Sequence, residues 1–429
     1  MPSSHPNESW SARRAGYTGA LSTPGEDGIE GAAILRECPG ALGVQLWGAL
    51  RDVMLWADPT RVGPPQFSAG EGLARANQIR AADMDHGLRA DLLDLAVRAT
   101  GGAPSSTPAL ADRCLRVAAW AEAHGAARTQ LAFLRAASLL RPDDAKLALD
   151  TGRLTRDLGF PAPAEAWLRR AIILARRQGE WETYAWGYVY LAWIYWRAGN
   201  LAGAMALARR ALRKARRHHL HTLHGAAHHS AFVFVSDRDP REAYSHALGA
   251  LHSFGSSHPR LPILAQDVAT YWADAGQYHR ALPVVEAVLP RIGSPNERGL
   301  AVAGLARAAA GVRQRDTYER ARAETLRTLS EAPSEGRKAE TLVVLARADA
   351  LMEEWPRARE LLEQAIQVAG RRGETYALAA AEAELAAACA ERGSCTEVSD
   401  PEPPAAARQA ERLRVELILS LGANAATAR

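Results

Sequence analysis

The chain has 429 residues, of which 48% are hydrophobic and 6% aromatic, and a formal net charge of +4. This length exceeds that of one ordinary compact core and suits two domains or one extended array. The apolar content excludes a mainly disordered chain, and no run approaches the roughly 20 apolar residues that a membrane-spanning helix needs.

The first hundred residues are expected to form a leader followed by a helical unit. Residues 1–30 are rich in Ser, Pro, Gly and Glu and predict a flexible leader. Within the unit at 31–100, apolar residues recur at helical spacing over 41–57, and further helices are expected near 68–82 and 86–99. The Gly-, Ser- and Pro-rich stretch at 101–110 predicts a linker between this unit and the rest.

Beyond the linker, mostly small residues recur in triplets, with the second member twelve positions after the first and the third seven positions later. The middle members are Gln130, Ala164, Ala204, Ala243, Ala281, Ala321 and Ala358, at intervals of 34 to 40 residues. Small side chains let antiparallel helices nest closely. Glycines such as Gly125 and Gly159, between the first and second members, suit the left-handed turn that joins paired helices. The pattern predicts about seven helical pairs over 111–372.

This arrangement resembles the tetratricopeptide repeat (TPR) family, with its best match at Leu191-Ala192-x2-Tyr195 followed by Gly199, Ala204, Ala208 and Ala211. The resemblance implies an all-α, right-handed superhelical solenoid with repeats of about 38–40 residues. Capping helices are expected over 373–421 and a tail at 422–429. The sixth repeat departs from the pattern, because Gly311 would fall inside its first helix. The alternative is an ordinary long helical protein in which abundant alanine recurs at these spacings.

The resemblance also implies that the first helix of each pair lines a concave groove. The residues expected to face it are Lys146, Arg153, Arg156, Trp186, Trp193, Trp196, Arg197, His228 and Phe232. Aromatic anchors bury large areas with few torsions to order, and arginine adds carboxylate and cation–π contacts. These residue types favour a protein or peptide partner with acidic and apolar side chains. The alternative is that the three tryptophans pack between neighbouring repeats.

A second candidate surface is basic, since no acidic residue occurs between Glu182 and Asp237. Six cations are expected to point outward from the second helix of the third repeat: Arg209, Arg210, Arg213, Lys214, Arg216 and Arg217. Such a patch suits phosphate oxygens or an acidic protein surface. The alternative is a solvated helix face whose cations favour the helix C-terminus.

Six histidines follow this helix between His218 and His229, and His221, His224 and His228 share a spacing of three and four. That spacing suits a transition-metal site. Because no Cys, Asp or Glu lies nearby to complete the ligand set, we expect surface histidines and no bound metal. The four cysteines are scattered and are expected to be reduced.

No phosphate loop, zinc-protease, nucleophile-elbow or dinucleotide motif occurs. The first residues also lack the apolar core of a secretory signal. We therefore expect a cytoplasmic, bacterial-type TPR scaffold or adaptor that binds a protein or peptide, without enzymatic activity or cofactor. The alternative is a TPR-type sensor or transcriptional regulator that contacts nucleic acid through the basic surface. Segment 41–99 lacks a convincing helix-turn-helix, which disfavours that alternative.

Overall fold

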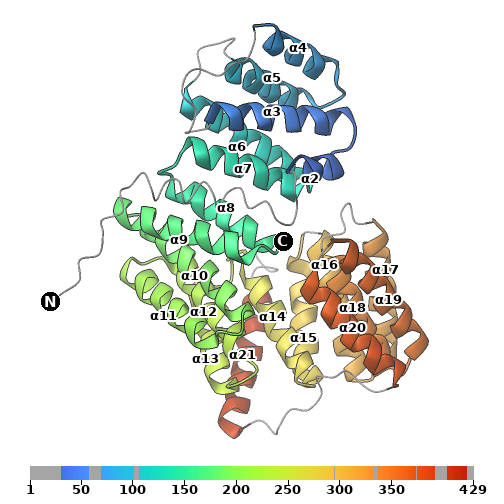
Figure 1. Ribbon diagram of the computed structural model, residues 1–429. Helices are drawn as coiled ribbons and strands as arrows, with labels where there is room; N and C mark the ends of the chain where they lie inside the picture. Colours follow the sequence, from blue (N-terminus) through green and yellow to red (C-terminus); the bar gives the residue numbers. More distant parts are fainter. Residues whose placement is uncertain are drawn as a thin grey trace, which may run out of the picture. The chain divides into compact units, whose positions relative to one another are not determined.

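The computed structural model describes residues 30–57, 69–100, 106–293, 295–331, 337–372, 374–391 and 403–422. Throughout these residues the regular secondary structure is helical, with no strand, which confirms the all-α prediction (Figure 1). Except for Glu30 and Gly422, the expected leader and tail lie outside the described residues. Among the described helices, none is both long enough and apolar enough to cross a membrane.

The chain divides by its internal packing into two compact units, Met1–Asn200 (unit 1) and Leu201–Arg429 (unit 2). The helices of unit 1 are α2 (Glu30–Glu37), α3 (Ala41–Ala57), α4 (Ala69–Ala81), α5 (His86–Ala99), α6 (Thr107–Ala123), α7 (Ala127–Leu140), α8 (Ala145–Asp157), α9 (Pro161–Gln178) and α10 (Trp181–Arg197).

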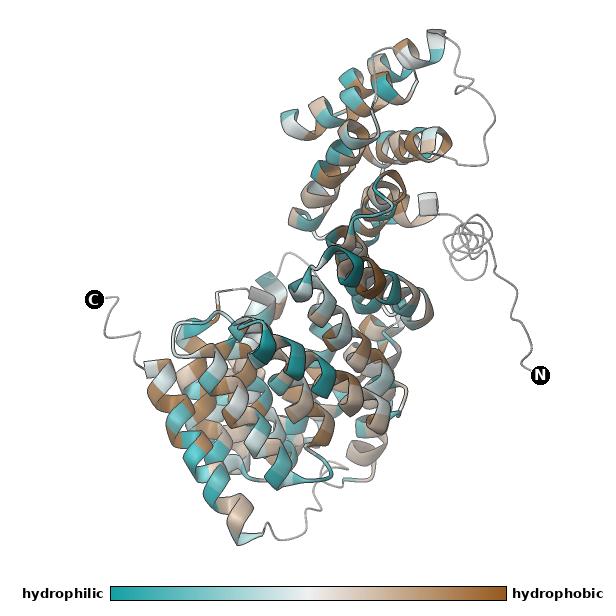
Figure 2. Ribbon diagram, turned by 90° about the vertical axis from the view of Figure 1, so that its left-hand side faces the viewer, coloured by the Kyte–Doolittle hydropathy of each residue, from teal (hydrophilic) through white to brown (hydrophobic). Residues whose placement is uncertain are grey.

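The described residues of unit 2 form a further series of helices and one 3-10 turn. These are α11 (Leu201–Arg217), α12 (His221–Val235), α13 (Pro240–Phe254), α14 (Leu261–Asp274), α15 (Tyr278–Val288), η1 (Leu289–Arg291), α16 (Pro295–Gly311), α17 (Arg315–Glu331), α18 (Lys338–Leu351), α19 (Trp355–Arg372), α20 (Thr375–Cys389) and α21 (Pro404–Gly422). Most helices of both units carry hydrophilic and hydrophobic residues side by side, as the amphipathic helices of a stack do (Figure 2).

Consecutive helices pack as pairs, α6 with α7 and α8 with α9 in unit 1, and α12 with α13 through α18 with α19 in unit 2. The middle members of the triplets lie at these contacts, where Ala164, Ala243 and Ala281 are fully buried. Gly125 and Gly159 adopt positive φ angles of 71° and 86° in the turns between paired helices, as their left-handed role requires. Short side chains and left-handed turns thus produce the predicted stack.

The N-terminal helices of unit 1 pack directly on its first repeat. One core joins Ile34, Leu50 and Leu92 from α2, α3 and α5 to Cys114 of α6 and Phe133 of α7, all at most 1% exposed. Helix α6 already begins at Thr107, inside the expected linker at 101–110. The helices on both sides of that linker therefore share one hydrophobic core.

Gly311 is the last residue of α16, and the ring of Tyr278 from α15 lies against it. A Cβ atom added at Gly311 would come within 2.1–2.5 Å of the Tyr278 ring carbons. The glycine that departs from the repeat pattern therefore makes room for an aromatic side chain of the preceding pair.

The two C-terminal helices take different positions within unit 2. Helix α20 continues the stack on α18 and α19, whereas α21 packs against α13, α14 and α15, beside which Figure 1 shows it in red. The Arg291 guanidinium donates to the carbonyl oxygens of Ser420 and Leu421 at 3.1 and 2.6 Å, and His252 Nε2 lies 2.8 Å from Glu416 Oε2. The expected capping helices are thus divided between the end and the middle of the array.

Candidate functional site

Helix α10 places a partly exposed aromatic surface on unit 1. Tyr184 and Tyr188 are buried, whereas Trp186, Trp193 and Trp196 keep part of their area in contact with solvent. Trp186 stacks on Tyr190 with ring centroids 5.4 Å apart, and Trp193 meets Trp196 edge to face at the same distance. Among the partly exposed rings of α10, we call Trp186, Tyr190, Trp193 and Trp196 the aromatic surface. The helix thus has one face in the core and another available for contact.

The basic residues of α8 lie beside acidic partners on the same helix. Lys146 Nζ lies 2.7 Å from Asp150 Oδ1, while Arg153 and Arg156 both pair with Asp157, at 3.5 and 2.6 Å. These carboxylates, which the repeat spacing does not reveal, partly neutralise the cations.

Arg156 also connects α8 to the aromatic surface. Its guanidinium carbon lies 4.8 Å from the centroid of the Tyr190 ring, a cation–π geometry. Arg197, at the end of α10, is exposed. The structure therefore brings Arg156 and the rings together, while Lys146 stays 65% exposed in its pair with Asp150.

In unit 2, the prediction that Phe232 faces an open groove is wrong. Phe232 is 1% exposed and meets Tyr271 of α14 edge to face, with centroids 5.8 Å apart. His228 is half-buried, and its Nδ1 lies 2.9 Å from Nδ1 of His246 on α13. The repeat offset failed because the next pair supplies a large ring that covers this part of α12.

In the basic helix α11 the buried residues include Ala204, Ala208, Ala211 and Ala215, and none of the six cations is buried. All except Lys214, which is half-buried, are exposed. Arg209 approaches Glu242 of α13 at 3.7 Å, with both side chains well solvated. The helix therefore presents a positively charged surface on unit 2.

The histidines near α12 contact several different partners. His224 Nδ1 lies 2.8 Å from Ser253 Oγ, and His229 Nε2 lies 2.8 Å from Asp267 Oδ2. Within the described residues, no three His, Cys, Asp or Glu side chains gather as a metal ion would require. His224 and His229 therefore contact polar side chains of the neighbouring helices α13 and α14.

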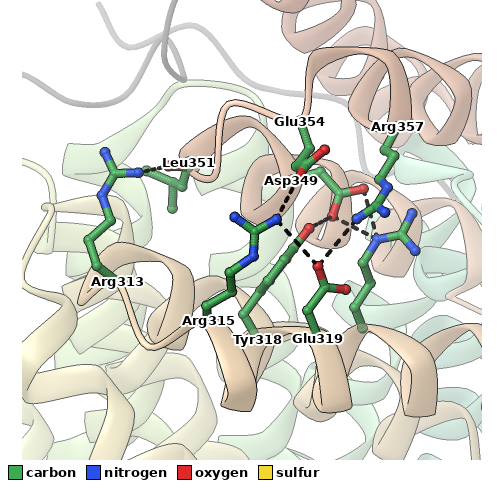
Figure 3. A network of polar contacts seen from close by, with 9 residues as sticks. Arg313, Arg315, Tyr318, Glu319, Asp349, Leu351, Glu354 and Arg357 are labelled. Carbon is green, nitrogen blue, oxygen red and sulfur yellow. Dashed lines mark hydrogen bonds and ion pairs between the residues drawn. The ribbon is translucent and has the colours of Figure 1, made fainter.

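A polar network that the sequence analysis missed connects α17 to the next pair, α18 and α19 (Figure 3). The Tyr318 hydroxyl donates to Oδ1 of the fully buried Asp349 at 2.7 Å, and Arg322 Nε donates to the same carboxylate at 3.0 Å. Burial raises the pKa of Asp349 and the pKa of Tyr318. Around them, Arg315 pairs with Glu354 at 2.9 Å. Because these groups satisfy one another, the network serves to fasten consecutive pairs.

A second feature absent from the sequence analysis is a mostly apolar cavity in unit 2, formed by α14, α15 and α16 with Val344 of α18. The empty space there is about 470 Å³ when the open solvent beside it is included. Arg307 lines it and is only 2% exposed. The one sequence signal for this cavity is Gly304, a glycine in the interior of α16.

Comparison with known proteins identifies one repeat of the chain. The tetratricopeptide repeat model matches residues 185–220, and no curated protein matches the chain. Among solved structures, similarity is found to a Rap protein complexed with competence and sporulation factor, at 12% identity over 81% of this chain and 97% of that one (TM-score 0.42). The apo quorum sensor NprR from B. thuringiensis is 14% identical over 86% of this chain and 98% of that one (TM-score 0.45). The match identifies a tetratricopeptide repeat at residues 185–220, and the described helices before and after it pack in consecutive pairs on small residues, as such repeats do.

Proposed function

We propose that this protein is a non-enzymatic scaffold that binds a protein or peptide partner on the aromatic surface of unit 1. The observation that carries the proposal is that Trp186, Trp193 and Trp196 keep solvent-exposed area on one helix. Indole rings bury large areas at low entropic cost, and they are enriched among the residues that dominate binding energy at interfaces.

The chemistry of the surface favours a partner with apolar and acidic side chains. The rings supply the apolar contact, while Arg156 and Arg153 share the single carboxylate of Asp157. A solvated ion pair contributes only about 0–1 kcal/mol, so a carboxylate of the partner can replace Asp157 at little cost. Lys146 and Arg197 extend the positive charge at the margins.

Selection of peptides from a displayed random library against the full chain tests this proposal. We expect enriched peptides to combine aromatic or aliphatic side chains with Asp or Glu. The double variant Trp193→Ala with Arg153→Glu should lose binding of these peptides by about tenfold or more, with an unchanged far-UV circular dichroism spectrum.

The matched control is Trp355→Ala, which removes a half-buried indole from unit 2. It should bind the selected peptides as the wild type does. Equal binding by the double variant and the wild type would contradict the proposal and favour the alternative that the three indoles only pack between repeats.

The exposed cations of α11 favour a second candidate function, contact with nucleic acid. Nucleic-acid binding through α11 should weaken steeply with salt, because each neutralised phosphate releases counterions. Reversing Arg213 and Arg216 to Glu should then abolish retention on single- or double-stranded oligonucleotides. If the variant is still retained on the oligonucleotides, α11 is not the nucleic-acid-binding surface.

A further inference from the structure

The walls of the unit 2 cavity are almost entirely aliphatic. Side chains from successive turns of α14, α15 and α16 line it, among them Ala269, Ala281, Val285, Val288 and Leu300. Polar atoms enter only from Gln266, Thr270 and Arg307. A concave, mostly apolar space with a few polar groups is the usual form of a small-ligand site.

Arg307 lines this cavity and carries one hydrogen-bond donor that no described residue satisfies. Its Nη1 pairs with Asp274 Oδ1 at 2.5 Å and its Nη2 donates to the carbonyl oxygen of Ala273 at 3.2 Å. Its Nε–H is buried and finds no acceptor among the described residues. A buried donor without a partner costs free energy, which an acceptor entering the cavity would recover.

Gly304 keeps the space open. A Cβ atom added there would meet nothing within 4 Å, although the residue lies in the middle of α16. Alanine is the better helix former at such a position. Neither close packing nor helix stability requires a glycine at this position. A ligand that occupies the space beside Gly304 would account for it.

The charges around Arg307 are already balanced. Asp274 also approaches Arg347 Nη1 at 3.4 Å, and Arg347 Nε lies 2.8 Å from Glu384 Oε1. Two guanidinium groups therefore face two carboxylates. The cavity accordingly requires a neutral hydrogen-bond acceptor and an apolar body, with no further charge.

We propose that this cavity binds a short aliphatic group with a carbonyl oxygen beside it, and that the oxygen accepts the Arg307 Nε–H. A leucine-like residue of a peptide and a free small amide share this chemistry. The site is separate from the aromatic surface of unit 1, so the inference goes beyond the proposed function.

Titration of the full chain with N-acetyl-leucine methylamide and with hexanamide, followed by saturation-transfer NMR, tests the inference. We expect at least one of the probes to bind saturably. Gly304→Leu fills the cavity and should weaken binding about tenfold or more. Gly370→Leu is the matched control, because a Cβ atom there also meets nothing within 4 Å, on an exposed part of α19. It should leave the affinity unchanged.

Arg307→Lys separates the hydrogen bond from the apolar space. Lysine keeps a positive charge for Asp274 but lacks the Nε–H, so the amide probes should bind about tenfold more weakly. Xenon, which enters apolar cavities, should bind to this variant as it does to the wild type. Loss of xenon binding together with loss of the amides would contradict the assigned role of Nε.

The probes identify the source of the ligand. Binding of the leucine derivative alone indicates a peptide residue, and binding of hexanamide alone indicates a free acyl compound. No saturable binding of either probe, or equal binding by Gly304→Leu, overturns the inference. Peptide binding at the aromatic surface would be unaffected by that result, so the two proposals fail separately.

Discussion

At the scale of single residues, Glu37 caps a helix that begins about ninety positions later in the chain. Its two carboxylate oxygens accept hydrogen bonds from the backbone N–H groups of Arg128 and Thr129, at 2.9 and 2.8 Å. Helix α7 has no side-chain cap of its own at Ala126. A residue of α2 thus satisfies donors that the first turn of α7 leaves open.

Glu37→Ala should therefore destabilise unit 1 by about 1–3 kcal/mol, because two backbone donors lose their acceptor. Guanidinium unfolding followed by tryptophan fluorescence measures the change. Glu122→Ala, on the exposed face of α6, is the control and should leave the midpoint in place. Equal midpoints for both variants would show that the cap contributes nothing.

The pair His228 and His246 makes stability depend on pH. Burial lowers the pKa of His228 from 6.5 to about 4, with His246 and His224 adding to the shift. Burial also lowers the pKa of His246, although Glu242 opposes it and Arg209 contributes to it. The unfolded chain therefore takes up protons first as the pH falls. Stability is fully present above about pH 6.5 and decreases toward about pH 4.

The variant His228→Gln should show a smaller loss of thermal stability between about pH 7.5 and about pH 5 than the wild type, because it removes one of the two coupled rings. Differential scanning calorimetry at the two pH values measures this difference. His279→Gln changes an exposed ring and should retain the wild-type pH dependence. A wild-type slope in His228→Gln would exclude the pair as its source.

At the scale of elements, two of the glycines in helix α16, Gly304 and Gly311, should respond oppositely to substitution by alanine. Gly304→Ala should stabilise unit 2 by up to about 1 kcal/mol, since the new methyl group meets empty space and helix propensity improves. Gly311→Ala should destabilise it by about 1–3 kcal/mol, since the methyl group collides with the Tyr278 ring. Urea unfolding of both variants provides the comparison. The same sign for both would contradict the packing described around α16.

The end of helix α21 is held by hydrogen bonds from Arg291. Arg291 donates to the carbonyl oxygens at the end of that helix, where unpaired acceptors otherwise accumulate. Arg291→Ala should speed amide hydrogen exchange in α21, while α6 to α9 exchange as before. Mass spectrometry resolves the segments. Unchanged protection of α21 would show that its buried leucines alone hold it.

At the scale of the whole molecule, the sequence predicted the paired helices, which depend on residue spacing within short segments. Paired helices follow from alanines at fixed intervals and from glycines in the turns, both short-range signals. Amphipathicity predicted α21 as a helix but did not identify α13, α14 and α15 as its partners. Side-chain partners were missed for the same reason. Tyr271 covers Phe232 from another pair, and the orphan donor of Arg307 becomes visible only when α14 and α16 are side by side.

The return of α21 has a consequence for how unit 2 is made. Repeats that contact only their neighbours can form one after another as they leave the ribosome. Glu416, however, meets His252 across 164 residues, and Leu421 meets Arg291 across 130. The face of α13, α14 and α15 that α21 covers therefore stays exposed to other nascent chains until α21 has been translated.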